Sequence, residues 1–130
     1  MIKKITLIIT LLSLNSCATN QITSPIAGTW KADFDGCIEI WKIDDKGNRT
    51  SISGEEETKN KFTLRKLNDN LFSITDTRLG TNSKPDCSGE IVEVPLGNVT
   101  NGILKFQGND KFILCNSEEC LEGSPFIRIK

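Results

Sequence analysis

Cysteine is the residue type with the most chemistry to offer in this chain. Five cysteines occur among 130 residues, at positions 17, 37, 87, 115 and 120, whereas histidine and tyrosine are absent. Thiols can pair as disulfides or ligate zinc, but a histidine-based triad, a histidine-ligated metal and a histidine proton shuttle are all excluded. The chemistry that the fold must position is therefore that of sulfur and of carboxylates.

The residues before the first cysteine form a short export pattern. Lys3 and Lys4 precede the mostly apolar run Ile5–Leu14, and Leu14-Asn15-Ser16-Cys17 follows. Ten apolar residues match the length of a signal-peptide core, and a membrane-spanning helix needs about 20. The segment therefore predicts export, by way of either a lipoprotein signal or an ordinary secretory signal.

Leu14-Asn15-Ser16-Cys17 resembles the lipobox of bacterial lipoproteins, although Asn15 departs from the usual residue at its position. The resemblance implies that Cys17 becomes the mature N-terminus and receives a diacylglycerol and an N-acyl chain. Two or more acyl chains hold a protein stably on a bilayer. Because Ala18 follows the cysteine, the same resemblance implies an outer-membrane lipoprotein that faces the periplasm.

This interpretation divides the chain into a signal peptide (1–16), a lipidated cysteine with a polar tether (17–27) and one domain (28–130). Removing the two lysines of the signal leaves 14 basic and 17 acidic residues, a net charge of −3. An acidic domain is not expected to bind nucleic acid, whose binders are basic. The lipid, with no polybasic patch to assist it, would attach the protein to the membrane.

If Cys17 is lipidated as the resemblance implies, four cysteines remain. An even number in a small exported domain predicts two disulfides, and three pairings are possible. We favour Cys115–Cys120, because the polar link between them can turn, together with Cys37–Cys87. The alternative is a zinc site made of all four, but they lack the CxxC spacing of zinc ribbons.

Period-two alternation and turn residues dominate the domain. Trp30, Ala32 and Phe34 share one face of a predicted strand, and Asp35-Gly36 is a hairpin signal. About nine short strands follow at intervals of roughly ten residues. They include a strand at Ser88–Val94, with turns expected at 58–60 and at 97–102. We predict an all-β, antiparallel up-and-down barrel of eight to nine strands, or alternatively a β-sandwich.

Gly28-Thr29-Trp30, at the start of the first predicted strand, resembles the Gly-x-Trp motif of lipocalin-like barrels. The resemblance implies that Trp30 packs at the closed barrel end with a basic side chain, here Arg128, over its ring. The domain is shorter than a typical lipocalin, which predicts a barrel filled by side chains in place of a roomy ligand cup. As a small lipid-anchored barrel with disulfides, the predicted domain also resembles the membrane-bound lysozyme inhibitors.

Candidate binding residues are Trp41, Arg78 and Lys84. Tryptophan is enriched at interaction hot spots, although Trp41 falls in an apolar strand and core is its default assignment. Arg78 and Lys84 belong to a long polar segment, 78–87, that a disulfide at Cys87 would hold in place. The acidic run Glu55–Glu57 is expected to be a solvated edge that discourages strand pairing.

These features predict a non-enzymatic, lipid-anchored binding module that needs no cofactor and no metal. Its partner would be a periplasmic protein or a small apolar ligand. One alternative is an antagonist, either an inhibitor of a wall-degrading enzyme or an immunity protein. Another is a carboxylate-dependent hydrolase using a pair such as Asp33 and Glu39. An apolar internal cavity would favour the small ligand, and a filled barrel with a projecting loop would favour a protein.

Overall fold

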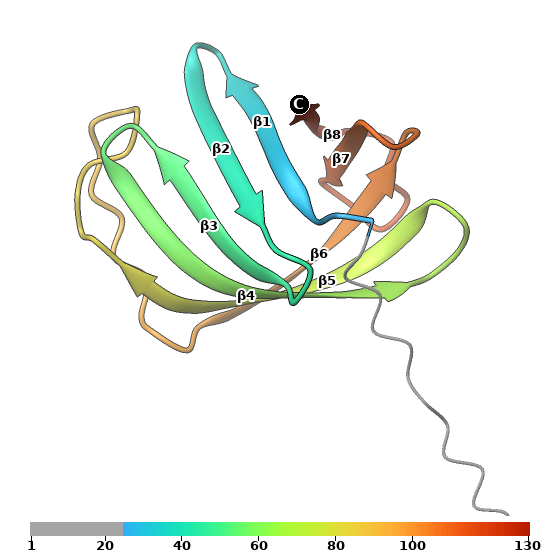
Figure 1. Ribbon diagram of the computed structural model, residues 1–130, viewed down its shortest axis with the longest axis horizontal. Helices are drawn as coiled ribbons and strands as arrows, with labels where there is room; N and C mark the ends of the chain where they lie inside the picture. Colours follow the sequence, from blue (N-terminus) through green and yellow to red (C-terminus); the bar gives the residue numbers. More distant parts are fainter. Residues whose placement is uncertain (1–24) are drawn as a thin grey trace, which may run out of the picture.

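Eight antiparallel strands close into a single barrel in the computed structural model, which describes residues 25–130 (Figure 1). The predicted signal peptide, Cys17 and most of the tether lie outside the described residues. Each strand pairs with the next along the chain, and the last returns to the first. The predicted all-β up-and-down barrel is thus confirmed over the sandwich. Within residues 25–130, no helix is long and apolar enough to cross a membrane.

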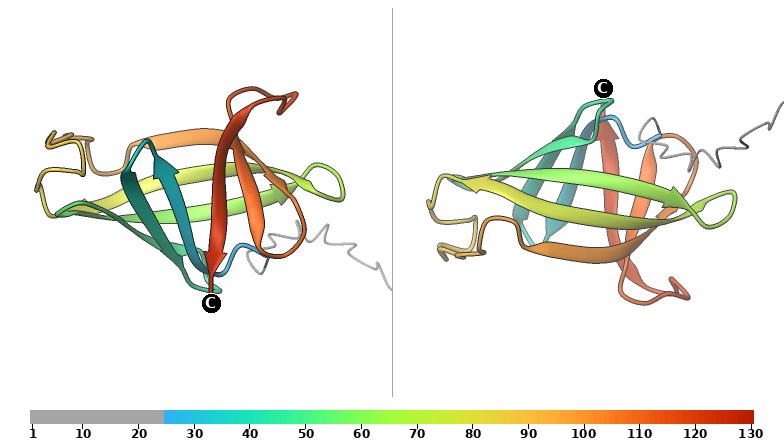
Figure 2. Two further views of the ribbon diagram at one scale, coloured as in Figure 1. Left: turned by 90° about the horizontal axis from the view of Figure 1, so that it is seen from above. Right: turned by 90° about the horizontal axis from the view of Figure 1, so that it is seen from below.

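The strands vary from five to eleven residues, and the two longest are adjacent. They are β1 (Gly28–Phe34), β2 (Cys37–Ile43), β3 (Asn48–Ser53), β4 (Glu56–Lys66), β5 (Leu71–Thr81), β6 (Val99–Phe106), β7 (Lys111–Cys115) and β8 (Gly123–Ile129). Closure is narrow, because β8 pairs with β1 over three residues, Thr29–Lys31. Figure 2 shows the long β4–β5 ribbon extending past the shorter strands on both sides.

Aromatic rings fill one half of the barrel. Phe112 stacks on Phe126 with ring centroids 4.9 Å apart, and Trp41 lies 4.3 Å from Phe126. Burying one such side chain contributes about 1.5–3 kcal/mol, so this cluster supplies much of the stability. The buried aromatic residues are Trp30, Trp41, Phe62, Phe72, Phe106, Phe112 and Phe126.

Arg128 closes the end of the barrel at which β1 begins. Its guanidinium lies 4.1 Å from the centroid of the Trp30 ring, the contact that the lipocalin resemblance implied. It also donates hydrogen bonds to the carbonyls of Ala27 (2.7 Å) and Pro25 (3.1 Å). Gly28 leaves the space this requires, since a Cβ there would clash with the guanidinium and its φ is +135°.

Two disulfides join the four cysteines in the favoured pairing. Cys37–Cys87 links the start of β2 to the loop after β5, and Cys115–Cys120 closes the turn after β7. The Cα atoms are 5.3 and 4.9 Å apart, within the range that a disulfide spans. The zinc alternative is therefore wrong, because the four sulfurs are used in two separate bridges.

Several local predictions are also wrong. Ser88–Val94 is not a strand, because no neighbouring strand pairs with it and most of its side chains face solvent. The expected turn at 58–60 lies within β4, and Asn101-Gly102 lies within β6. In both places a long partner strand continues the ladder through residues whose local preference is to turn.

Candidate binding site

The connection between β5 and β6, residues 82–98, is the longest in the described chain and projects from one end of the barrel (Figure 1). It is held at several points. The Cys37–Cys87 disulfide ties it to the β1–β2 hairpin, and the Glu55 N–H donates to the Pro85 carbonyl at 3.2 Å. The Asn82 side chain donates to the Glu55 carbonyl at 2.9 Å. The loop is therefore bound to both neighbouring hairpins.

Asp86 organises the inner turn of this loop. Its carboxylate accepts hydrogen bonds from the Ser88 hydroxyl (2.6 Å) and from the N–H groups of Ser88 (2.8 Å) and Glu90 (3.0 Å). These bonds to the ionised form hold the pKa of Asp86 below its ordinary value. Gly54 packs directly beneath, since a Cβ there would lie 2.7 Å from the Asp86–Cys87 backbone.

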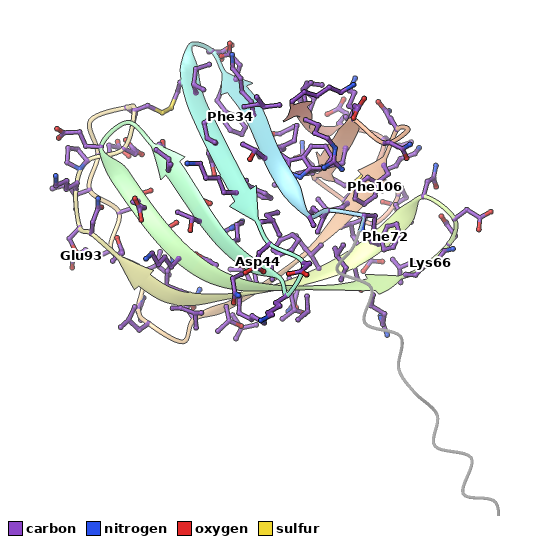
Figure 3. The ribbon with its side chains drawn as sticks, viewed as in Figure 1. Phe34, Asp44, Lys66, Phe72, Glu93 and Phe106 are labelled. Carbon is purple, nitrogen blue, oxygen red and sulfur yellow. A yellow bond between two sulfur atoms is a disulfide. The ribbon has the colours of Figure 1, made fainter. Side chains whose placement is uncertain are left out.

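The surface here is both apolar and acidic. We call the three touching segments 33–39, 53–57 and 82–98 the loop end. They carry nine acidic residues and one basic residue, Lys84, while the whole chain has a net charge of only −1. Figure 3 shows Glu93 pointing outward from the loop. Large apolar side chains are exposed on the loop end and the strand residues beside it: Phe34, Leu79, Ile91, Val92, Leu96 and Val99.

Beneath the loop end the barrel interior is polar. Arg49 is 8% exposed and pairs with Asp76 at 2.8 Å, and its guanidinium lies 4.2 Å from the centroid of the Trp41 ring. Burial lowers the pKa of Arg49, and the charge of Asp76 opposes that shift. Among the described residues, every buried side-chain nitrogen or oxygen without a protein hydrogen-bond partner belongs to this region: Arg49 Nε, Ser51 Oγ, Asn60 Oδ1, Asp76 Oδ1 and Arg78 Nε.

Glu56 lies where this interior meets the loop. Burial raises its pKa above the ordinary value, and the charge of Arg78 acts in the opposite direction. Glu39 faces the same interior and accepts a hydrogen bond from the Trp41 indole N–H. Asp33 is on the other face of the sheet, because its neighbour Ala32 is the residue that pairs with Glu39. The suggested acid–base pair is therefore not brought together.

The three candidate binding residues separate in space. Trp41 is core, at 5% exposed, and Arg78 lies opposite Asn60 in the polar interior. Lys84 is exposed on the loop. The apolar loop residues were not identified as a binding surface from the sequence. The alternating run after Gly89 contains some of them, but its pattern predicts a strand.

A groove of about 1240 Å³ lies over β4, β5 and β6 and is bordered by residues 115–118. Its lining is mixed, with the hydroxyls of Thr63, Ser73 and Thr75 beside Ile103. No group of three or more acidic or cysteine side chains in residues 25–130 is placed to hold a metal ion. Comparisons with protein-family models, with curated proteins and with solved structures found no match to this chain.

Proposed function

We propose that this protein is a lipid-anchored binding module of the outer membrane, facing the periplasm, whose loop end docks on a basic surface of a protein partner. It acts by occupying that surface, as an inhibitor or immunity protein does, and not by catalysis. The observation that carries the proposal is an acidic loop that a disulfide holds in place, with exposed apolar side chains, at one end of a barrel with a packed core.

The filled interior favours a protein over a small apolar ligand. Aromatic rings occupy one half of the barrel, and a buried Arg49–Asp76 pair with other polar groups occupies the rest. An apolar ligand in this space would have to break the Arg49–Asp76 hydrogen bond, and it would offer no partner to the other buried polar groups. Each buried hydrogen-bonding group left unsatisfied costs about 1–3 kcal/mol.

The loop end has features that suit a protein partner. Its contacts to both neighbouring hairpins limit the entropy lost on binding. Side chains such as Ile91 (57% exposed) and Leu96 (67% exposed) can be buried at an interface. The acidic residues around them would steer a basic partner to the site and reject acidic proteins.

The position of the tether supports this arrangement. Pro25 contacts Arg128 at the start of β1, whereas the loop end begins where β1 finishes (Figure 1). Pro25 is eight positions after Cys17 in the sequence, and an extended chain of that length spans at most about 29 Å. A lipid at Cys17 would hold the barrel close to the bilayer with its loop end directed away.

Capture of the partner tests the proposal. The acylated protein, purified from its own cell envelope after crosslinking, is compared with Glu90→Lys/Glu93→Lys and with Asp110→Lys, a charge reversal at the other end of the barrel. We expect one basic protein to be recovered in stoichiometric amount with the wild type and the Asp110 variant, and to be lost with the double variant. Equal recovery of the partner with the wild type and the double variant would contradict the proposal, and so would an apolar small molecule that co-purifies with the protein.

A further inference from the structure

Strand β6 has a free edge next to the loop end. It pairs with β5 from Val99 to Lys105 but with β7 only from Ile103 to Phe106. Within residues 25–130, therefore, the stretch Val99–Gly102 has no strand on its second side. Figure 1 shows β6 emerging from the long loop before it meets β7.

The hydrogen-bond pattern identifies which groups are free. The Phe106 N–H donates to Asn70 on the β5 side, and the Gln107 N–H donates to Lys111 on the β7 side. Along an antiparallel strand, the main-chain N–H and C=O groups of successive residues point alternately to one side of the strand and to the other. Val99 and Asn101 therefore point their N–H and C=O groups away from β5, toward the side that β7 leaves open. Both residues are exposed.

The open side is also hollow. The chain leaves the sheet after Cys115, where the Cys115–Cys120 disulfide closes a short turn. The groove of about 1240 Å³ that lies over β4, β5 and β6 has Asn101–Ile103 in its lining and extends to residues 115–118. It thus begins where a longer β7 would have continued.

A comparison within the barrel shows that this edge is unprotected. Strands β8 and β1 also separate, beyond Ile127 and Lys31. The Arg128 N–H donates to the Asp110 carbonyl on the β7 side. Because the main-chain groups of successive residues point to opposite sides, those of residue 125 point toward β1. Residue 125 is a proline, which has no N–H to offer there. Proline and charge are the usual protection of free edges. The β6 edge, Val99-Thr100-Asn101-Gly102, carries neither.

We propose that the edge Val99–Gly102 binds an extended segment of a partner protein as an added β-strand, antiparallel to β6 and in line with β7. The N–H and C=O groups of Val99 and Asn101 would supply the main-chain hydrogen bonds, as in other strand-addition complexes. Side chains on the outer face of the added strand would lie over the groove beside Ile103. The inference rests on the proposed function in one respect, that the partner is a protein, and it specifies how part of that partner is held.

Random heptapeptides displayed on phage provide the probe, selected against the full-length protein in detergent micelles. Asn101→Pro removes the free N–H, and Asn101→Thr is the matched control that keeps it. We expect enriched peptides to bind wild type and Asn101→Thr within about twofold of each other, and Asn101→Pro at least tenfold more weakly. Thermal melts of each variant identify any loss that arises from misfolding.

Amide hydrogen exchange of the wild type gives a second result that needs no variant. Bound peptide should slow exchange at Val99 and Asn101, and leave Thr100 unchanged, since its N–H already faces β5. The inference is overturned if no peptide is enriched, if peptides bind Asn101→Pro equally well, or if these two amides are not protected. A dimer that Asn101→Pro makes monomeric would overturn it in favour of a second copy of the chain. Loss of the loop charges should leave peptide binding intact, which separates this test from that of the proposed function.

Discussion

The buried pair of Arg49 and Asp76 offers the most quantitative test of a closed, filled barrel. The two side chains are 8% and 13% exposed, and one 2.8 Å hydrogen bond joins them. Removing one partner of such a pair costs about 3–5 kcal/mol, because the other charge stays buried and unpaired. The loss of unfolding free energy for Asp76→Leu should be near the lower figure, because Arg49 still contacts the Trp41 ring and is still stabilised by the negative charge of Glu39.

Replacing both charges should cost much less than the sum of the single changes. Arg49→Met with Asp76→Leu removes both charges of the pair, so neither is left buried without the other, and apolar replacements of buried pairs are often neutral. We therefore expect a coupling energy of about 2 kcal/mol or more between the two positions. Urea unfolding followed by tryptophan fluorescence, with the disulfides intact, measures all four free energies of unfolding.

Additive costs would refute this reasoning. A loss below about 1 kcal/mol for Asp76→Leu is typical of a solvated surface pair. It would mean that water enters the polar part of the barrel interior freely, and that a small ligand could enter there as well.

Three further predictions concern the ends of the barrel. Arg128→Leu should destabilise the domain by about 2 kcal/mol and shift Trp30 emission, because the cation–π contact and charged hydrogen bonds are lost; unchanged melting would contradict this. Cys37→Ser with Cys87→Ser should cost about 4 kcal/mol, given the 50-residue separation, and should speed amide exchange chiefly in residues 82–98; uniform exchange would contradict it. Because the folded-state pKa of Asp86 is lowered, its stabilisation is present above its unfolded value of about 3.9 and is lost as pH falls through the lowered value. Carboxyl NMR titration should show this transition below pH 4 together with loop loosening, and Asp86→Asn should remove the coupled loosening.

Much of the fold could be predicted because its signals are local. Alternation such as Trp30, Ala32 and Phe34 assigns a strand and its inward face without knowledge of the partner strand. Short turns then force consecutive strands to pair, which leads to a meander and its closure. The Cys115–Cys120 bridge followed from a five-residue separation, and Cys37–Cys87 followed from it by elimination.

The binding end could not be predicted, because it depends on long-range pairing. Residues 88–94 alternate as a strand would, yet no strand pairs with them, and the Cys37–Cys87 bridge and the Asp86 turn hold them at the barrel end. Arg49 and Asp76 are 27 residues apart and meet only through the register of β3, β4 and β5. Period two shows that each faces inward or outward, but not which charge it will meet.

Site-specific photocrosslinking in living cells tests the central claim most directly. A benzophenone amino acid placed at Ile91, on the loop, is compared with one at Leu121, which is even more exposed but lies in the turn after β7. We predict one discrete protein adduct from position 91 and none of that mass from position 121. Equal adducts from both positions, or none from position 91 when the protein is at its native level, would contradict the account.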